Sequence, residues 1–228
     1  MSSPLEVAVF DVNETLSDLT PLAARFTDVG APAALAPLLV RVWFASVLRE
    51  GIALAVTGEQ AWFADIGADL LGGVLDPAWL TTDLADATSQ VMDGFTRLPV
   101  HPDVVPGVRA LAQTGLRLVT LSNGAAGIAE RLLGEHGLRD RFERVLSVED
   151  AGVWKPHPRA YAYAASVCGT DPARMLMVAV HPWDLHGAAR SGMRTAWIDR
   201  AGSRYPAHAA APTYAVDALT ALPDALAG

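Results

Sequence analysis

The sequence predicts an α/β protein in which a parallel sheet is flanked by helices and an α-helical segment is inserted after the first strand. From about Pro99 onward, short apolar runs typical of strands alternate with segments typical of helices, a rhythm that favours a parallel sheet. Residues 19–96 break this rhythm, because they contain three helix-like stretches and no convincing strand. We therefore expect a core domain of residues 1–18 and 97–228 and a helical cap domain of residues 19–96.

The elements of the core follow from local patterns. The first strand is expected at Leu5–Asp11, a short apolar run with β-branched residues that ends in polar ones. Gly137 marks the end of one later helix, and Pro158 stands in the first turn of another. The elements after the cap are expected in the order helix 105–114, strand 116–121, helix 127–136, strand 144–148, helix 158–168, strand 175–180, helix 185–192 and strand 195–199. In open α/β sheets, ligands bind beyond the carboxyl ends of the strands, so a helical insert leaving the first strand is placed to act as a lid.

Composition narrows the class of protein. The chain has 228 residues, of which 51% are hydrophobic, enough to bury a core in one large domain or in a domain with an insert. The net charge of -8 argues against nucleic acid or an anionic membrane as a partner. No stretch approaches the roughly 20 apolar residues that span a bilayer, and the beginning lacks the basic segment and cleavage site of a signal peptide. The single cysteine, Cys168, rules out an internal disulfide, so we expect a cytoplasmic protein.

Four groups of polar residues fall at or just beyond the expected strand ends. In chain order they are Asp11, the run Ser122-Asn123-Gly124, Lys155, and the pair His181 and Asp184. Each alone has an ordinary structural explanation, since a strand-terminal Asp or Ser often caps the next helix. However, Lys155 is the sole lysine of the chain, and Asn13 and Asn123 are its sole asparagines. Residue types that the composition otherwise avoids therefore stand beside these features, which suggests a chemical role.

Taken together and in this order, the motifs "FDVNETL", "LSNG", "WKPHP" and "HPWDLHGA" resemble those of the haloacid dehalogenase superfamily. The resemblance covers essentially the whole chain. It implies a Rossmann-like parallel sheet with a cap inserted after the first strand, in agreement with the pattern of elements. It also implies that Asp11 is a nucleophile.

Two positions separate the branches of this superfamily. Its phosphatases carry a second Asp two residues after the nucleophile, whereas this chain has Asn13, which cannot exchange a proton at physiological pH. Those phosphatases also bind Mg²⁺ through an acid whose position falls on Val180, and valine offers a cation no oxygen ligand. The chain therefore resembles the metal-free branch, the type II (L-2-haloacid) dehalogenases, and neither a cofactor nor a metal is expected.

The resemblance implies a role for each catalytic candidate. Asp11 attacks the α-carbon of a 2-haloacid from the face opposite the halogen and forms an ester with inversion of configuration. Lys155 holds the Asp11 carboxylate by ion pairing. Water directed by His181 and Asp184 then cleaves the ester. Either a neutral His181 oriented by Asp184 or Asp184 alone can serve as the base, and the sequence leaves both alternatives open.

The substrate-binding candidates also follow from the resemblance. Ser122 with nearby backbone N–H groups would hold the substrate carboxylate, and Asn123 with a cap arginine would stabilise the leaving halide. Arg41 matches the spacing of the family arginine, and Arg49 is its rival. Trp183 matches a pocket position and has core packing as its alternative. The cap aromatics Trp43, Phe44, Trp62 and Phe63 are candidates for the pocket collectively, although such residues more often form a helix core.

The chain departs from the family pattern at four positions. Asn13 replaces an aromatic residue, Glu14 a glycine, Ala179 a serine and His181 an asparagine. None of these removes the nucleophile or the lysine, so the expected reaction class is unchanged. A more polar pocket, with Asn13 and His181 able to donate hydrogen bonds, suits small haloacetates, including fluoroacetate.

The sequence thus predicts a metal-independent hydrolase that converts a short (S)-2-haloacid into the (R)-2-hydroxyacid and halide. The first alternative is a Mg²⁺-dependent phosphatase of the same superfamily. The second is a catalytically silent member that binds a small acid or a protein, although retention of both Asp11 and Lys155 argues against it. The apolar helices of the insert also predict a homodimer, as in related dehalogenases, with core packing as the alternative explanation.

Overall fold

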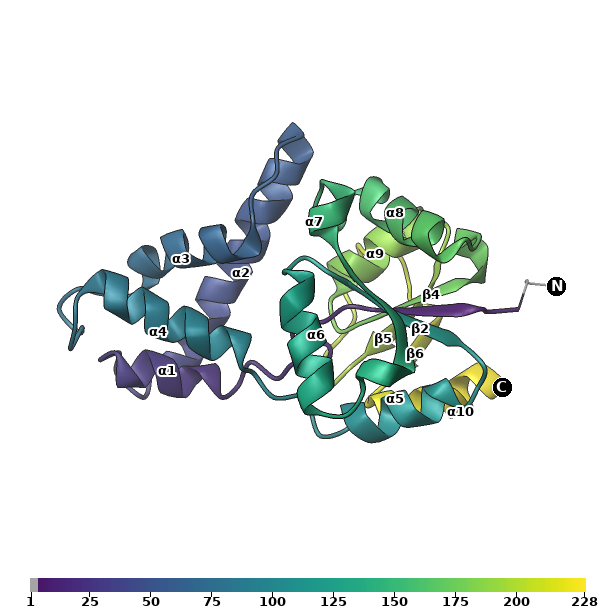
Figure 1. The fold of residues 1–228 in the computed structure, drawn as a ribbon, viewed down its shortest axis with the longest axis horizontal. Helices are drawn as coiled ribbons and strands as arrows, with labels where there is room; N and C mark the ends of the chain where they lie inside the picture. The colour runs from purple at the N-terminus through teal and green to yellow at the C-terminus, as the bar shows by residue number, and fades with distance from the viewer. Residues whose placement is uncertain (1–3) are drawn as a thin grey trace. The chain divides into compact units, whose positions relative to one another are not determined.

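A computed structural model describes residues 4–228. Within them, six parallel strands form one sheet in the order β3-β2-β1-β4-β5-β6 (Figure 1). The strands are β1 (Val7–Phe10), β2 (Arg117–Ser122), β3 (Phe142–Ser147), β4 (Met175–Ala179), β5 (Arg194–Ile198) and β6 (Tyr214–Val216). The predicted parallel α/β core is confirmed. Residues 1–3, with which the predicted core domain begins, lie outside the described residues.

Helices cover both faces of the sheet (Figure 1). They are α5 (Val104–Ala112), α6 (Ala126–Glu135), α7 (Val148–Ala151), α8 (Pro158–Cys168), α9 (Pro182–Arg190) and α10 (Leu222–Ala227), with 3-10 turns η1 (Arg139–Arg141), η2 (Pro172–Arg174) and η3 (Leu219–Ala221). Side chains of α5, α6 and α10 pack on one face, where Ala8 and Phe10 of β1 are fully buried. Val7 and Val9 alternate with them and are fully buried on the other face, as expected for a central strand covered on both sides.

Three short core elements, α7, β6 and α10, escaped the sequence pattern. The edge strand β6 spans three residues and α10 spans six, and both follow a stretch rich in proline and alanine. Such short segments contain too few residues to show a period of 2 or 3.6. β6 forms because its backbone pairs with β5, from Ala196↔Tyr214 to Ile198↔Val216. The formation of β6 therefore depends on its pairing with β5 and not on a pattern within its own three residues.

Strand β1 lies at the centre of the sheet, paired in parallel with β2 on one side and β4 on the other. The chain leaves β1 for the helical insert, leaves β2 for α6 and leaves β4 for α9. Since the strands are parallel, all of these departures occur at the same edge of the sheet. The order reverses at β1, and such a switch point is where open α/β sheets place their ligands.

The helical insert is a compact unit of its own, Asp18–Pro99, whereas the residues up to Ser17 form the other unit together with Val100–Gly228. The insert consists of α1 (Leu22–Asp28), α2 (Ala36–Thr57), α3 (Phe63–Val74) and α4 (Leu84–Thr96). The second boundary falls at Pro99, three residues beyond the expected Thr96, and Ser17 forms an antiparallel bridge with Val100. In residues 4–228, no helix combines the length and the apolar character that crossing a membrane requires.

Trp43 is the centre of the insert's core. Its ring is fully buried, and its indole N–H donates to the Gly67 carbonyl oxygen at 2.8 Å. Aromatic rings surround it edge-on or tilted, from Phe26, Phe44, Phe63 and Phe95. Three of the four cap aromatics proposed from the sequence are therefore core residues, as their helical spacing favoured. The fourth, Trp62, is 50% exposed.

Replacing Trp43 tests this packing. We expect Trp43→Ala to lower the free energy of unfolding by about 3–5 kcal/mol, because it removes a large, fully buried side chain and leaves a cavity among the surrounding aromatic rings. Trp62→Ala is the matched control and should change stability by less than about 0.5 kcal/mol. Urea denaturation followed by circular dichroism measures both. Equal losses of unfolding free energy in the two variants would contradict the assignment of Trp43 to the centre of the insert's core.

Candidate active site

A buried lysine joins two carboxylates at the carboxyl edge of the sheet. Lys155 Nζ lies 2.9 Å from Asp11 Oδ1 and 2.6 Å from Asp184 Oδ2, and the lysine is 0% exposed. Asp11 follows β1, Lys155 lies between α7 and α8, and Asp184 is in the first turn of α9. The three residues therefore come from distant parts of the chain and meet at the switch point. Sequence analysis predicted the pairing of Lys155 with Asp11, and the structure adds Asp184 as a second partner.

Tyr161 of α8 holds the second carboxylate and was not found from the sequence. Its hydroxyl lies 2.7 Å from Asp184 Oδ1 and 2.9 Å from the Asp184 carbonyl oxygen. A Cβ at Gly187 would come within 2.6 Å of the tyrosine oxygen and of Pro156 Cβ, so the close approach of α9 to α8 requires glycine there. The available signal was a tyrosine on the small, buried face of α8, next to Ala160 and Ala164.

The second oxygen of Asp11 accepts two hydrogen bonds. The first comes from the Thr15 hydroxyl, which donates to Asp11 Oδ2 at 2.7 Å. This hydroxyl is itself held in place, because its oxygen accepts from the backbone N–H of Val180 at 3.2 Å. His181 Nδ1 lies 3.1 Å from Asp11 Oδ2. The two oxygens of Asp11 are thus distinguished, since Oδ1 faces an ammonium group and Oδ2 faces a hydroxyl and an imidazole.

His181 also meets Glu14, a residue that sequence analysis noted only as a departure from the family pattern. The distance from His181 Nε2 to Glu14 Oε2 is 2.9 Å. Burial lowers the pKa of His181, but its hydrogen bonds to Asp11 and Glu14 outweigh this effect and raise the pKa to about 9. The imidazole is therefore protonated at neutral pH, which disfavours one of the two alternatives that the sequence left open, a neutral His181 acting as the base. The sequence did not reveal that a carboxylate contacts each ring nitrogen.

The two buried acids respond oppositely to their surroundings. Burial raises the pKa of Asp11, yet the charge of Lys155 and the contacts of His181 bring it well below the usual range of an aspartate. Burial raises the pKa of Asp184, and repulsion from Asp11 adds to this effect, so that its pKa stays above the ordinary value despite Lys155. Burial lowers the pKa of Lys155, but the two carboxylates raise it overall. Asp11 is therefore ionised at neutral pH, and Asp184 is the more basic of the two carboxylates.

The end of β2 fixes the backbone of the lysine. Asn123 and Lys155 exchange two hydrogen bonds, from Asn123 Nδ2 to the Lys155 carbonyl oxygen at 3.3 Å and from the Lys155 N–H to Asn123 Oδ1 at 3.0 Å. The Ser122 hydroxyl oxygen accepts from the Gly124 N–H at 2.9 Å, and Ser147 Oγ donates to the Gly124 carbonyl oxygen at 2.9 Å. The side chain of Asn123 thus positions Lys155, a function that the sequence did not reveal. Its halide-binding role remains a prediction.

The other predicted binding residues divide between the two compact units. Asn13 is buried, and its Nδ2 lies 3.5 Å from where a Cβ on Gly124 would stand, so it lines the same edge. The rings of Trp183 and His181 are 5.2 Å apart between centroids. Arg41 and Arg49 lie on α2 of the insert, where both are exposed and Arg49 pairs with Glu50 at 2.9 Å. A role for either arginine remains a prediction.

Arg200 supports the loop after β1. Its Nη2 donates to the Thr15 carbonyl oxygen at 2.8 Å, and its Nη1 forms an ion pair with Asp103. Asp103 also accepts from the Leu219 N–H at 2.7 Å. This connection fixes the segment that carries the Thr15 hydroxyl. Sequence analysis did not single out Arg200, although it lies two residues beyond the end of β5 and so shares the strand-end position of the other site residues.

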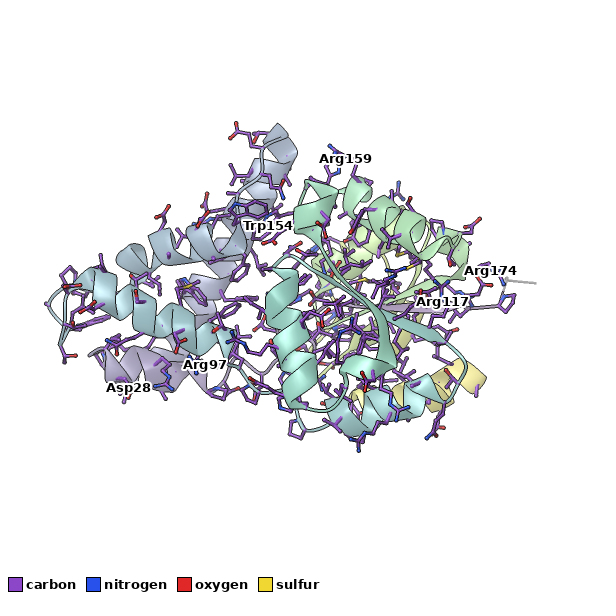
Figure 2. All side chains as sticks on the ribbon, viewed as in Figure 1. Asp28, Arg97, Arg117, Trp154, Arg159 and Arg174 are labelled. Carbon is purple, nitrogen blue, oxygen red and sulfur yellow. The ribbon has the colours of Figure 1, made fainter. Side chains whose placement is uncertain are left out.

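The opposite edge of the sheet carries a different kind of ion pair. Figure 2 shows Arg117 and Arg174 where the strands begin; Arg117 pairs with Glu143 at 2.7 Å and Arg174 pairs with Glu6. These side chains are more than one third exposed, so water screens them. The buried charges at the carboxyl edge therefore mark the candidate site. In residues 4–228, no group of three or more His, Cys, Asp or Glu side chains is arranged to hold a metal ion.

Comparison with known proteins agrees with this geometry. A sequence profile of the haloacid dehalogenase-like hydrolases matches residues 5–192. The (S)-2-haloacid dehalogenase of Xanthobacter autotrophicus is 31% identical over 199 residues, which cover 86% of this chain and 76% of the relative. Haloacetate dehalogenase H-2 of Moraxella sp. (strain B) is 29% identical over 181 residues, 79% of this chain and 80% of that protein. A solved structure of the Xanthobacter autotrophicus L-2-haloacid dehalogenase with chloropropionic acid covalently bound has a TM-score of 0.85 at 28% identity, covering 98% of this chain and 99% of its own.

Removing the lysine tests the electrostatics of the site. We expect Lys155→Met to lower the free energy of unfolding by about 3–5 kcal/mol at pH 7, because two carboxylates are left buried without a cation. Without the ammonium, the pKa of both acids rises in the folded protein. As the pH drops through these raised pKa values, the acids become protonated and destabilise the folded state less. The difference from the wild type should therefore narrow between pH 7 and pH 5 in urea titrations. Tyr161→Phe is the control, with a loss of about 1 kcal/mol at both pH values. A Lys155→Met loss that does not depend on pH would refute this description.

Proposed function

Because this chain belongs to the haloacid dehalogenase-like hydrolase family, we propose that it hydrolyses the carbon–halogen bond of short (S)-2-haloacids without a metal, giving the (R)-2-hydroxyacid and halide. The observation that carries the proposal is the Asp11 carboxylate, buried, ionised and held by Lys155 at 2.9 Å. The related enzyme from Xanthobacter autotrophicus, with chloropropionic acid covalently bound, supports a covalent route.

In the first step, an oxygen of Asp11 attacks the α-carbon from the face opposite the halogen. The new C–O bond forms as the C–X bond breaks, and the halide leaves with the bonding electron pair, which inverts the configuration. Halide is a competent leaving group, so no general acid is required, and Asn13 in place of an acid is compatible with the step. Lys155 and His181 hold the carboxylate in one orientation, which lowers the entropic barrier to attack.

In the second step, water attacks the Asp11 carbonyl carbon and loses a proton to a base. We assign this role to Asp184 rather than to His181. Burial and the charge of Asp11 raise the pKa of Asp184, which makes it a better proton acceptor than an ordinary aspartate. His181 already carries a proton at neutral pH. Tyr161 and Lys155 fix both oxygens of Asp184 and orient it.

Substrate binding completes the proposal. The Ser122 hydroxyl and neighbouring backbone N–H groups hold the substrate carboxylate, and Asn123 with Arg41, or Arg49 as the alternative, receives the halide. Asn13 and Trp183 line the pocket. The Asn13 amide and the protonated His181 make the edge polar, which suits haloacetates, including fluoroacetate. The relative from Moraxella, named a haloacetate dehalogenase, agrees with this preference.

The two alternatives are less well supported. For a Mg²⁺-dependent phosphatase, Asn13 offers no proton, and Val180 offers no side-chain oxygen to a cation. Each oxygen of Asp11 already faces a cationic side chain, Lys155 or His181, so the donor set does not fit a divalent ion. For a catalytically silent binding protein, the buried nucleophile–lysine pair has no purpose.

The remaining parts of the protein support this activity. The insert, residues 19–96, acts as the cap that excludes water from the chemistry, and the protein works in the cytoplasm. It forms a homodimer through an apolar surface at the start of α2. Leu35, just before the helix, and Leu38 and Val42 within it are each more than two fifths exposed and follow each other at helical spacing. The molar mass in solution by light scattering tests this assembly, and a mass near 24.0 kDa would contradict it.

Halide release from a panel of acids tests the function. The substrates are chloroacetate, fluoroacetate, and (S)- and (R)-2-chloropropionate, each with and without EDTA. We expect release that survives EDTA, favours the (S) isomer and falls at least about a thousandfold in Asp11→Asn, because an amide is not a nucleophile at this pH. Loss of release with EDTA, or Mg²⁺-dependent turnover of p-nitrophenyl phosphate, would favour the phosphatase. Absence of any turnover would favour the silent member.

A further inference from the structure

Glu14 is placed in an unusual way next to the nucleophile. Its backbone φ is 61°, a left-handed conformation that non-glycine residues seldom adopt. A glycine would fit this turn without strain. The glutamate therefore indicates that its side chain makes a contact that offsets the strain of the backbone. That side chain meets His181 Nε2 at 2.9 Å.

His181 connects Glu14 to Asp11 in a line. Its Nδ1 contacts Asp11 Oδ2 and its Nε2 contacts Glu14 Oε2, so a doubly protonated ring donates to both acids. Other charges around this line are Lys155, which pairs with Asp11 and Asp184, and Arg200, which binds the carbonyl oxygen of Thr15. Asp184 lies on the helix that His181 caps. Of these groups, Asp11 and Glu14 are the acids in hydrogen-bond contact with the ring.

We propose that Glu14 is a positioning residue that keeps His181 protonated and directed at Oδ2 of Asp11, so that Oδ1 attacks the substrate and Oδ2 becomes the ester carbonyl oxygen, whose developing charge His181 and Thr15 stabilise during hydrolysis. This inference rests on the proposed function. An alkylated oxygen is a poor hydrogen-bond acceptor, so the oxygen that accepts from both the Thr15 hydroxyl and the His181 imidazolium is better kept as the carbonyl.

In this scheme each oxygen of Asp11 has a fixed role. Oδ1 forms a bond to the α-carbon, and halide leaves with the electron pair. Water then bonds to Cγ of Asp11 and gives a proton to Asp184, while the C=O π pair moves to Oδ2, where the imidazolium and the Thr15 hydroxyl hold it. As the carbonyl re-forms, the Cγ–Oδ1 bond breaks, and the product oxygen takes the proton from Asp184. Asp11 returns to its carboxylate form by losing the remaining proton to solvent.

Glu14 matters most in the ester. Alkylation removes the negative charge of Asp11, which is one of the two acids that raise the pKa of His181 to about 9 in the resting protein. The hydrolysis step should therefore lose rate as pH rises through a value below 9. Glu14 is then the remaining carboxylate in contact with the His181 ring, so it sets the pH at which the rate of ester hydrolysis falls.

The experiment compares Glu14→Gln, Glu14→Gly and His181→Asn with the wild type, by rapid quench for the halide burst and for the decay of the ester. We expect both Glu14 variants to lose more rate in ester decay than in the burst, with the alkaline limb of ester decay about one pH unit lower or more. Glu14→Gly keeps the left-handed turn without strain, so agreement between the two variants excludes misfolding as the cause. His181→Asn keeps a neutral donor toward Asp11 and should lose this alkaline limb.

Adding Glu14→Gln to His181→Asn gives the decisive cycle. In the His181→Asn protein, Glu14 has no imidazole to position, so Glu14→Gln should have no further effect on the rate of ester decay. A further loss, or an alkaline limb that does not move in Glu14→Gln, overturns the inference.

Titration of the His181 ring by NMR decides the same point without turnover. The ring signal, assigned by its absence in His181→Asn, should titrate near pH 9 in the wild type and at least about one unit lower in Glu14→Gln. Equal values in the two proteins overturn the inference whatever the activity. A wild-type protein without a halide burst would instead overturn the proposed function, so the two failures can be told apart.

Discussion

The shared ion pair of Lys155 with Asp11 and Asp184 is the interaction on which the rest of the site depends. The crossover at the centre of a parallel sheet brings the two acids to the same edge, where burial and mutual repulsion would otherwise neutralise them. A fully buried ammonium, 2.9 Å and 2.6 Å from the two carboxylates, allows charge to remain there. The surrounding contacts hold this arrangement, with Asn123 fixing the lysine backbone and Tyr161 fixing Asp184.

Lys155 lowers the pKa of both of its partners, but their other contacts make the two acids differ. Asp11 also receives the Thr15 hydroxyl and the His181 imidazolium, and its pKa falls below the usual range. Asp184 is fully buried and repelled by Asp11, and its pKa rises. A site with an ionised nucleophile and a more basic acid nearby suits a reaction in two stages, with covalent attack first and proton transfer from water second. The proposed dehalogenation has these two stages.

Much of this arrangement was accessible from the sequence, because strand ends are local features. The apolar runs before Asp11, Ser122 and His181 predicted strands, and the parallel rhythm placed their ends on one edge. The role of Tyr161 was not accessible, since it depends on α9 approaching α8 at Gly187. The protonation of His181 was missed because it depends on contacts with Asp11 and Glu14, which lie 170 and 167 residues away in the chain.

The origin of the oxygen in the product tests the central claim, that Asp11 is the nucleophile, most directly. A single turnover with enzyme in excess over (S)-2-chloropropionate, in water enriched in ¹⁸O, separates the two possible sources. If Asp11 attacks carbon, the hydroxyl oxygen of the product comes from its carboxylate and carries no label, and the label enters Asp11 instead. A labelled product from the first turnover, with Asp11 unlabelled, would show that water attacks the substrate directly and would contradict the account.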